Sequence, residues 1–131
     1  MNRHKLDGLA ALVWMAFLFY LSSLPKLPGP EEILTIQVIR KSGHALVYGI
    51  LAYLDWRVLR AEPRLAAQST RWAWLLATIY ALADEIHQGF TPERHFTVTD
   101  VLIDAAGAAL AMLLVQRQLR PTVQQEQPPA R

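Results

Sequence analysis

The chain has 131 residues, of which 53% are hydrophobic and 18% charged, and its formal net charge at pH 7 is +2. This length suits one domain, and the composition is more apolar than that of an ordinary water-soluble chain. The absence of cysteine excludes disulfides and thiolate metal sites. A small net charge without a basic stripe or tract also argues against binding of DNA or RNA, so no nucleic-acid partner is expected.

The first predicted element is the uncharged run from Gly8 to Pro25. As a helix it would be about 27 Å long at ~1.5 Å per residue, close to the ~30 Å hydrocarbon thickness of a bilayer. Arg3, His4 and Lys5 precede the run, as in a signal peptide, but no small-residue cleavage signature follows it. We therefore expect a retained transmembrane helix.

Breaker residues fill the segment 25–30, and Glu31 and Glu32 behind Pro30 are typical of a helix start. Ile33, Ile36 and their neighbours are expected to form a short interfacial helix. Three weaker helical segments then follow, each with an uncharged stretch of only 12 or 13 residues, at 41–59, 72–90 and 98–116. Uncharged runs this short are more typical of buried helices in soluble proteins.

Two patterns nevertheless favour a membrane. Tryptophans flank one end of the second and third segments, as in an interfacial belt, at Trp56, Trp72 and Trp74. Nine of the 13 Lys and Arg residues fall in the N-terminus, the second connection and the tail. The positive-inside tendency therefore predicts an all-α, four-helix transmembrane bundle with N- and C-termini cytoplasmic, in a multi-pass protein of the cell membrane. We expect one domain over residues 1–119 and a disordered tail over 120–131.

This topology places three separate polar patches toward the outer leaflet. They are Lys41 with His44, the run Asp84 to Gln88, and Asp100 with Asp104. A charged side chain at the bilayer centre costs roughly 2.5 to 3.5 kcal/mol on insertion scales, so such residues usually face a protein interior or a water-filled cavity. We therefore expect the patches to converge in one extracytoplasmic polar cluster.

Helical spacing indicates which of these side chains share a face. One face carries Lys41, His44 and Tyr48; a second carries Tyr80, Asp84 and either His87 or Gln88; a third carries Asp100, Asp104, Gly107 and Ala111. Glu85 lies about 100° around its helix from Asp84, so it is expected to face a loop or headgroups. The small residues Gly107, Ala108 and Ala111 would let the last helix approach a neighbour closely.

Three blocks in this order and spacing resemble the VanZ-like family of small bacterial membrane proteins. The blocks are Lys41-x-x-His44-x-x-x-Tyr48, Asp84-Glu85-x-His87-Gln88-x-Phe90-x-Pro92-x-Arg94, and Asp100-x-x-x-Asp104-x-x-Gly107. Family members often carry Asn where Asp104 stands, so the resemblance implies no general need for that charge. It does imply a cell-envelope role connected with resistance to the glycopeptide antibiotic teicoplanin. It implies no particular reaction.

The first functional hypothesis is a non-enzymatic envelope protein whose cluster binds a lipid headgroup, a lipid-linked cell-wall precursor or a glycopeptide antibiotic. Lys41 and Arg94 would contact the anionic part of that ligand. With neutral histidines the cluster has a net charge of −2, so it requires a protonated acid, a charged histidine or a bound cation. The candidate ligand-binding residues are Lys41, His44, Tyr48, Asp84, Glu85, Gln88, Arg94, Asp100 and Asp104.

Three alternatives stay open. A membrane-embedded hydrolase or phosphoryl-transfer enzyme would act on a lipid-linked intermediate, with a divalent metal ion or a water as cofactor and with catalytic candidates His44, Asp84, His87 and Asp100. A proton-coupled transporter would use a relay of Asp84, His87, Asp100 and Asp104, and would need an oligomer for sufficient room. In a purely structural interpretation, Asp84 pairs with Arg94, and Lys41 pairs with Asp100 or Asp104.

Overall fold

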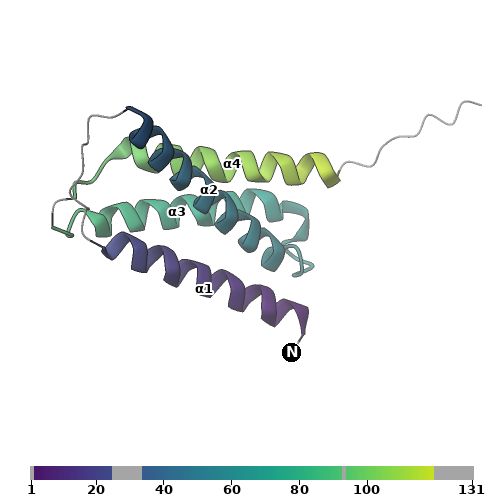
Figure 1. Ribbon diagram of the computed structural model, residues 1–131. Helices are drawn as coiled ribbons and strands as arrows, with labels where there is room; N and C mark the ends of the chain where they lie inside the picture. Colours follow the sequence, from purple (N-terminus) through teal and green to yellow (C-terminus); the bar gives the residue numbers. More distant parts are fainter. Residues whose placement is uncertain (1, 25–33, 93, 120–131) are drawn as a thin grey trace, which may run out of the picture.

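The computed structural model describes residues 2–24, 34–92 and 94–119. They form the α-helices α1 (Arg3–Ser23), α2 (Leu34–Leu59), α3 (Ser69–Gln88) and α4 (Val98–Leu119), with a short 3-10 helix, η1 (Ala66–Gln68), before α3. Figure 1 shows that successive helices run in opposite directions, so α1 and α3 end where α2 and α4 begin. The predicted all-α, four-helix architecture is confirmed.

The start of α2 differs from the prediction. The helix begins at Leu34, ahead of Lys41, and includes Ile36. A separate interfacial helix around Ile36 is therefore wrong, because neither Pro nor Gly interrupts the chain between Leu34 and Ser42 and the helix continues through the charged turn. Ile33, the acidic pair at 31 and 32, and the tail at 120–131 lie outside the described residues.

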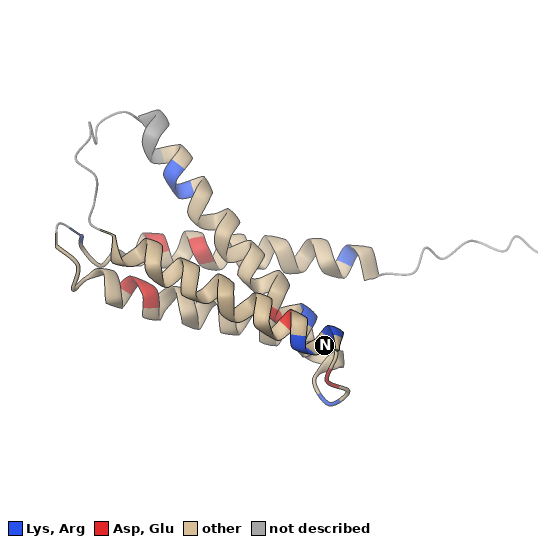
Figure 2. Cartoon of the chain, turned by 60° about the horizontal axis from the view of Figure 1, so that its bottom comes forward, with Lys and Arg blue, Asp and Glu red and all other residues tan. Residues whose placement is uncertain are grey.

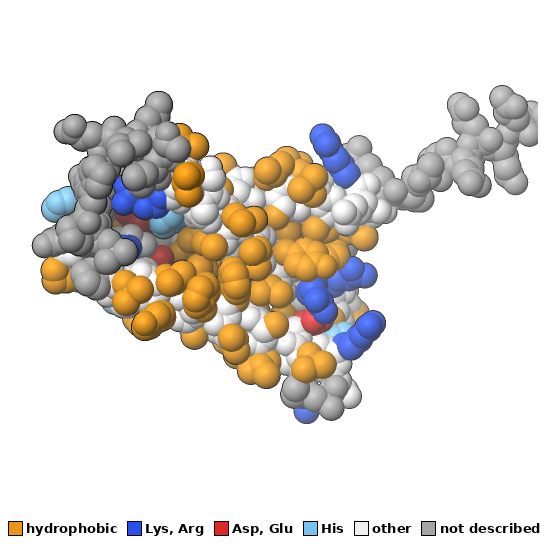
Figure 3. Space-filling model, in the orientation of Figure 1, with side chains coloured by type: hydrophobic (Ala, Val, Ile, Leu, Met, Phe, Trp, Pro, Cys, Tyr) orange, Lys and Arg blue, Asp and Glu red, His pale blue; other side chains and the backbone are white. Residues whose placement is uncertain are grey.

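The interior of the bundle is built largely from small residues. Fully or almost fully buried alanines line α2, α3 and α4, while large apolar side chains face outward: the former include Ala52, Ala73, Ala77, Ala81 and Ala108, and the latter include Leu12, Val13, Ile79 and Leu110. A water-soluble bundle normally buries its large apolar residues. Figure 3 shows hydrophobic side chains across the middle of the molecule, with Lys and Arg toward its two ends.

Two helices have the length and composition needed to cross a bilayer. In the part of the chain that the structure describes, these helices are α1 and α4. In the most apolar 18-residue stretch of each helix, only 17% of the residues of α1 and 22% of those of α4 are buried. Charged residues in α2 and at the end of α3 shorten the uncharged stretches of those helices, as the sequence indicated.

A close crossing joins α2 to α4. A Cβ atom added at Gly107 would overlap the backbone carbonyl of Ala45, and one added at Gly49 would lie 3.2 Å from the carbonyl oxygen of Gly107. Ala108 is fully buried beside this crossing. The prediction that small residues bring the last helix close to a neighbour is confirmed.

The tryptophans do not form a uniform belt. Trp72 and Trp74 are 43% and 40% exposed, whereas Trp56 is only 6% exposed and packs in the core beneath the Arg60 guanidinium. The anchor role expected for Trp56 is therefore wrong, because its indole is enclosed by the bundle.

On α1, the Trp14 indole N–H donates to the carbonyl of Val47 at 3.0 Å and so ties α1 to α2.

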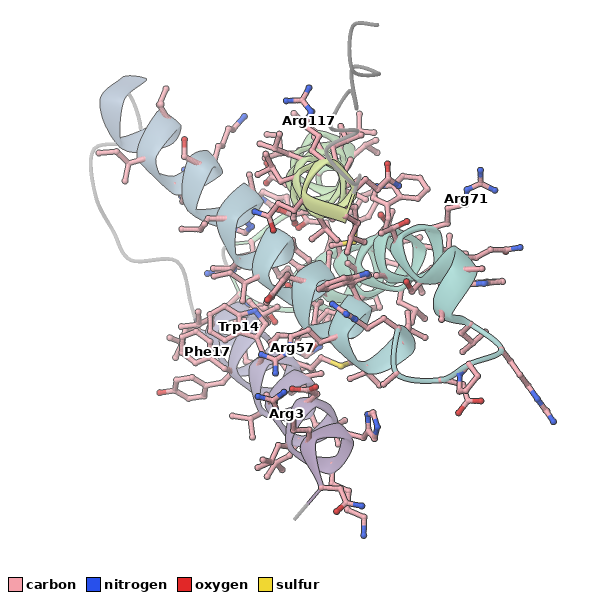
Figure 4. The ribbon with its side chains drawn as sticks, turned by 90° about the vertical axis from the view of Figure 1, so that its right-hand side faces the viewer. Arg3, Trp14, Phe17, Arg57, Arg71 and Arg117 are labelled. Atoms are coloured by element: carbon pink, nitrogen blue, oxygen red, sulfur yellow. The ribbon has the colours of Figure 1, made fainter. Side chains whose placement is uncertain are left out.

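Each helix places an arginine at the end of the bundle that contains the N-terminus. Figure 4 looks onto this end and shows Arg3 on α1, Arg57 on α2, Arg71 on α3 and Arg117 on α4. Arg57 pairs with Asp7 of α1. These basic groups lie at the end opposite the acidic residues of α3 and the start of α4 (Figure 2).

Candidate functional site

Polar side chains from three helices and one loop meet at the end of the bundle where the chain passes from α3 to α4. We call this set the polar cluster: His44, Tyr48, Asp84, Glu85, Gln88, Arg94, Asp100 and Asp104. Three of its acids are buried, with exposed fractions of 7% for Asp84, 2% for Glu85 and 3% for Asp104. The contacts described below bring together His44, Asp84, Glu85, Gln88 and Asp104 from the three predicted patches.

A chain of hydrogen bonds runs from α2 to the loop after α3. The Tyr48 hydroxyl donates to Asp84 Oδ2 at 2.9 Å, and Gln88 Nε2 donates to the same oxygen at 3.1 Å. Arg94 Nη1 in turn donates to Gln88 Oε1 at 3.0 Å. The direct Asp84–Arg94 pair of the structural interpretation is therefore wrong, since Gln88, one helical turn after Asp84, lies between the two charges.

A second contact joins α2 to α4. His44 Nδ1 lies 3.5 Å from Asp104 Oδ1, and the exposed side-chain fractions are 32% and 3%. Neither atom makes a hydrogen bond with correct geometry to any described residue, and the same holds for Asp84 Oδ1. A buried acceptor without a donor costs about 1 to 3 kcal/mol. The buried part of the cluster therefore has unused hydrogen-bond acceptors.

Glu85 fixes the start of α4. Its Oε1 accepts a hydrogen bond of 2.8 Å from the backbone N–H of Thr97, the residue before α4 begins. Because only 2% of Glu85 is exposed, it faces the loop and not the headgroup region, so the first of its two expected orientations is confirmed and the second is wrong.

An apolar groove lies at the end of α3 and in the loop that follows it. Ile86, Gly89, Phe90 and Phe96 line this shallow, open hollow of about 360 Å³. Gly89 directly follows Gln88, and Phe96 is two residues after Arg94, so the groove and the hydrogen-bond chain are built from the same stretch of the chain, the end of α3 and the loop that follows it. A Cβ added at Gly89 would lie 3.2 Å from the carbonyl oxygen of Ile86 and would make an ordinary contact with the Cβ of Phe96 at 3.7 Å. Sequence reasoning did not identify this groove.

A family model described as VanZ/LLP1 matches residues 8–119. The chain belongs to the VanZ/LLP1 family. No curated protein and no solved structure matches the chain. The resemblance seen in the sequence is therefore confirmed, and it extends beyond 41–107 to nearly all of the four helices. The polar cluster and the apolar groove both lie within the VanZ/LLP1 region.

Two predicted residues of this VanZ/LLP1 domain lie apart from the hydrogen-bonded acids. Lys41 is exposed on α2, and among the described residues it forms no ion pair with Asp100 or Asp104. His87 faces α1, where its Nε2 is 3.1 Å from Ser23 Oγ and its ring stacks on Phe19. The predicted relay through His87 therefore has no direct contact with the acids in the described residues.

Sequence reasoning missed Ser23. The only signal was its position, as one of two serines that close the long apolar run of α1. Its hydroxyl donates to the carbonyl of Phe19 at 2.8 Å. Asp100 is half-buried in the first turn of α4, one turn before Asp104, so it lies on the same face as that acid.

Metal ligands are sparse in the described part of the VanZ/LLP1 domain, where no three His, Asp or Glu side chains converge closely enough to hold an ion. His44 and Asp104 offer one imidazole and one carboxylate at 3.5 Å. A catalytic zinc site usually has three protein ligands, so a metal held here would need a further group.

Proposed function

We propose that this VanZ/LLP1 protein spans the cell membrane four times, with both termini in the cytoplasm and the polar cluster at the extracytoplasmic face. Two observations support this arrangement. Large apolar side chains face outward between two polar ends, and one arginine from each helix lies at the end opposite the cluster: Arg3, Arg57, Arg71 and Arg117. Residues 1–119 would form the membrane domain, and 120–131 a cytoplasmic tail.

In this proposal the polar cluster binds the phosphate-bearing headgroup of a membrane lipid or of a lipid-linked cell-wall precursor. The observation that carries it is the half-buried Arg94, which Gln88 holds in the same loop that contributes Phe96 to an apolar groove. A guanidinium presents a planar set of donors that matches phosphate oxygens. The groove between Ile86 and Phe96 would hold the first carbons of the attached chain.

Lipid binding by the purified protein tests this function. Native mass spectrometry of the detergent-solubilised chain measures how much phosphatidylethanolamine or phosphatidylglycerol is retained at each lipid concentration. We expect Arg94→Gln to weaken the binding of both lipids by about tenfold, which is the scale of one charge-assisted hydrogen bond. Arg71 is an exposed arginine at the opposite end of the bundle. The variant Arg71→Gln therefore serves as the matched control and should have no such effect. Equal retention by both variants would contradict the proposed function.

A second candidate, a membrane hydrolase, is favoured by the Ser23–His87 contact. A serine hydroxyl within hydrogen-bond distance of an imidazole is the arrangement of a nucleophile and its base. It ranks second because the single hydroxyl proton of Ser23 already has an acceptor in the Phe19 carbonyl. Labelling by a fluorophosphonate probe, lost in Ser23→Ala and retained in Ser22→Ala, would favour the hydrolase over the binding protein.

A further inference from the structure

The charges of the polar cluster suit a ligand that carries a cation as well as a phosphate. Within the cluster Arg94 stands against four acids, of which Asp84, Glu85 and Asp104 are buried, while Lys41 lies apart and is exposed. A phosphate bound to Arg94 would add further negative charge to this end of the bundle. Buried charges are normally compensated by a partner, so the ligand itself is a natural source of positive charge.

The structure also shows where that cation would be held. Asp84 and Asp104 are more than nine-tenths buried, and the Oδ1 atom of each has no hydrogen-bond partner among the described residues. Asp104 Oδ1 points across the α2–α4 interface toward the ring of His44. The His44 ring is itself 32% exposed, so this contact has one solvent-exposed side. Asp100 lies on the same face as Asp104, one turn nearer the start of α4.

We infer that the polar cluster recognises a zwitterionic headgroup of the ethanolamine phosphate type, with the phosphate on Arg94 and a primary ammonium on the carboxylates of Asp104 and Asp84. This inference rests on the proposed headgroup-binding function. A primary ammonium has three N–H donors for the unpartnered oxygens. A quaternary ammonium has none and is usually held by a cage of aromatic faces, whereas the unused groups here are carboxylate oxygens.

The test compares lipids that share their acyl chains and differ in the headgroup. Native mass spectrometry of the full chain would measure the apparent affinities for phosphatidylethanolamine, phosphatidylcholine and phosphatidylglycerol. We expect phosphatidylethanolamine to bind at least about tenfold more tightly than the other two, since only it supplies ammonium N–H donors. Equal affinities for the three lipids would overturn the inference while leaving the proposed function intact, provided that Arg94→Gln still weakens all of them.

Variants of the carboxylates give a second readout. Asp104→Asn and Asp100→Asn should each lower the preference for phosphatidylethanolamine over phosphatidylcholine by several fold, while Asp7→Asn at the opposite end of the bundle leaves it unchanged. Asp100 is only half-buried, so its variant is informative even if Asp104→Asn does not fold. An unchanged lipid preference in a folded Asp100→Asn and a folded Asp104→Asn would overturn the inference.

Soluble O-phosphoethanolamine distinguishes the two sources of this headgroup chemistry. Competition by the soluble compound at the same concentration as the lipid would support recognition of the headgroup alone. Competition by phosphatidylethanolamine only would support a lipid ligand that also needs the apolar groove. Displacement by glycerol phosphate as readily as by O-phosphoethanolamine would contradict any recognition of the amine.

Discussion

The Tyr48 hydroxyl donates a 2.9 Å hydrogen bond to Asp84 Oδ2, and both side chains are buried. This bond joins α2 to α3 at the inner side of the polar cluster. Only Gln88 also donates to that oxygen among the described residues, so the carboxylate depends on two donors. The arrangement makes Asp84 part of the packing of the bundle as well as of its candidate site.

Tyr48→Phe should lower the free energy of unfolding by about 1 to 2 kcal/mol, because the buried Asp84 carboxylate loses one of its donors while the ring is kept. Thermal unfolding in detergent, followed by circular dichroism, measures the change. Tyr53→Phe is the matched control on the same helix, since Tyr53 is 42% exposed. Equal stability of the two variants would show that the Tyr48–Asp84 bond contributes little.

Gly107→Ala should destabilise the protein by about 1 to 3 kcal/mol, the usual cost of overpacking a well-packed interface. The added Cβ would meet the backbone carbonyl of Ala45, which cannot rotate away as a side chain can. Gly43→Ala is the matched control, because nothing lies within 4 Å of its added Cβ and alanine favours a helix. The same unfolding assay applies, and a neutral Gly107→Ala would mean that α2 and α4 are less closely packed.

Glu85→Leu should cost about 1 to 3 kcal/mol, because the backbone N–H of Thr97 loses its acceptor at the start of α4. Glu85→Gln keeps an acceptor oxygen and should retain most of the stability. We also expect Glu85→Gln to bind phospholipid like the unmodified chain, since Glu85 faces the loop. Loss of lipid binding in a stable Glu85→Gln variant would instead show that Glu85 contacts the ligand directly.

Much of the arrangement of this VanZ/LLP1 chain could be predicted from the sequence. Helical spacing and alternating helix direction determine the depth of a residue along the bundle, so His44, Asp84 and Asp104 were expected at one end. The close approach at Gly107 was also predicted, since only small residues allow backbones to meet.

Individual partners were harder to predict. Spacing along a helix does not give the rotation of that helix against its neighbours, nor the side-chain rotamers. Gln88 therefore comes between Asp84 and Arg94, and His87 faces Ser23 on α1, where no contact was expected. The start of α2 was placed too late because the charge of Lys41 was interpreted as a helix boundary.

The side of the membrane on which the polar cluster lies is the central claim, and single-cysteine labelling tests it most directly. The chain has no cysteine of its own, so Ser42→Cys, His95→Cys and Glu62→Cys each introduce one exposed thiol. With a membrane-impermeant maleimide on intact cells, we predict labelling at positions 42 and 95, and labelling at position 62 only after permeabilisation. Labelling of positions 62 and 95 from the same side would contradict the account.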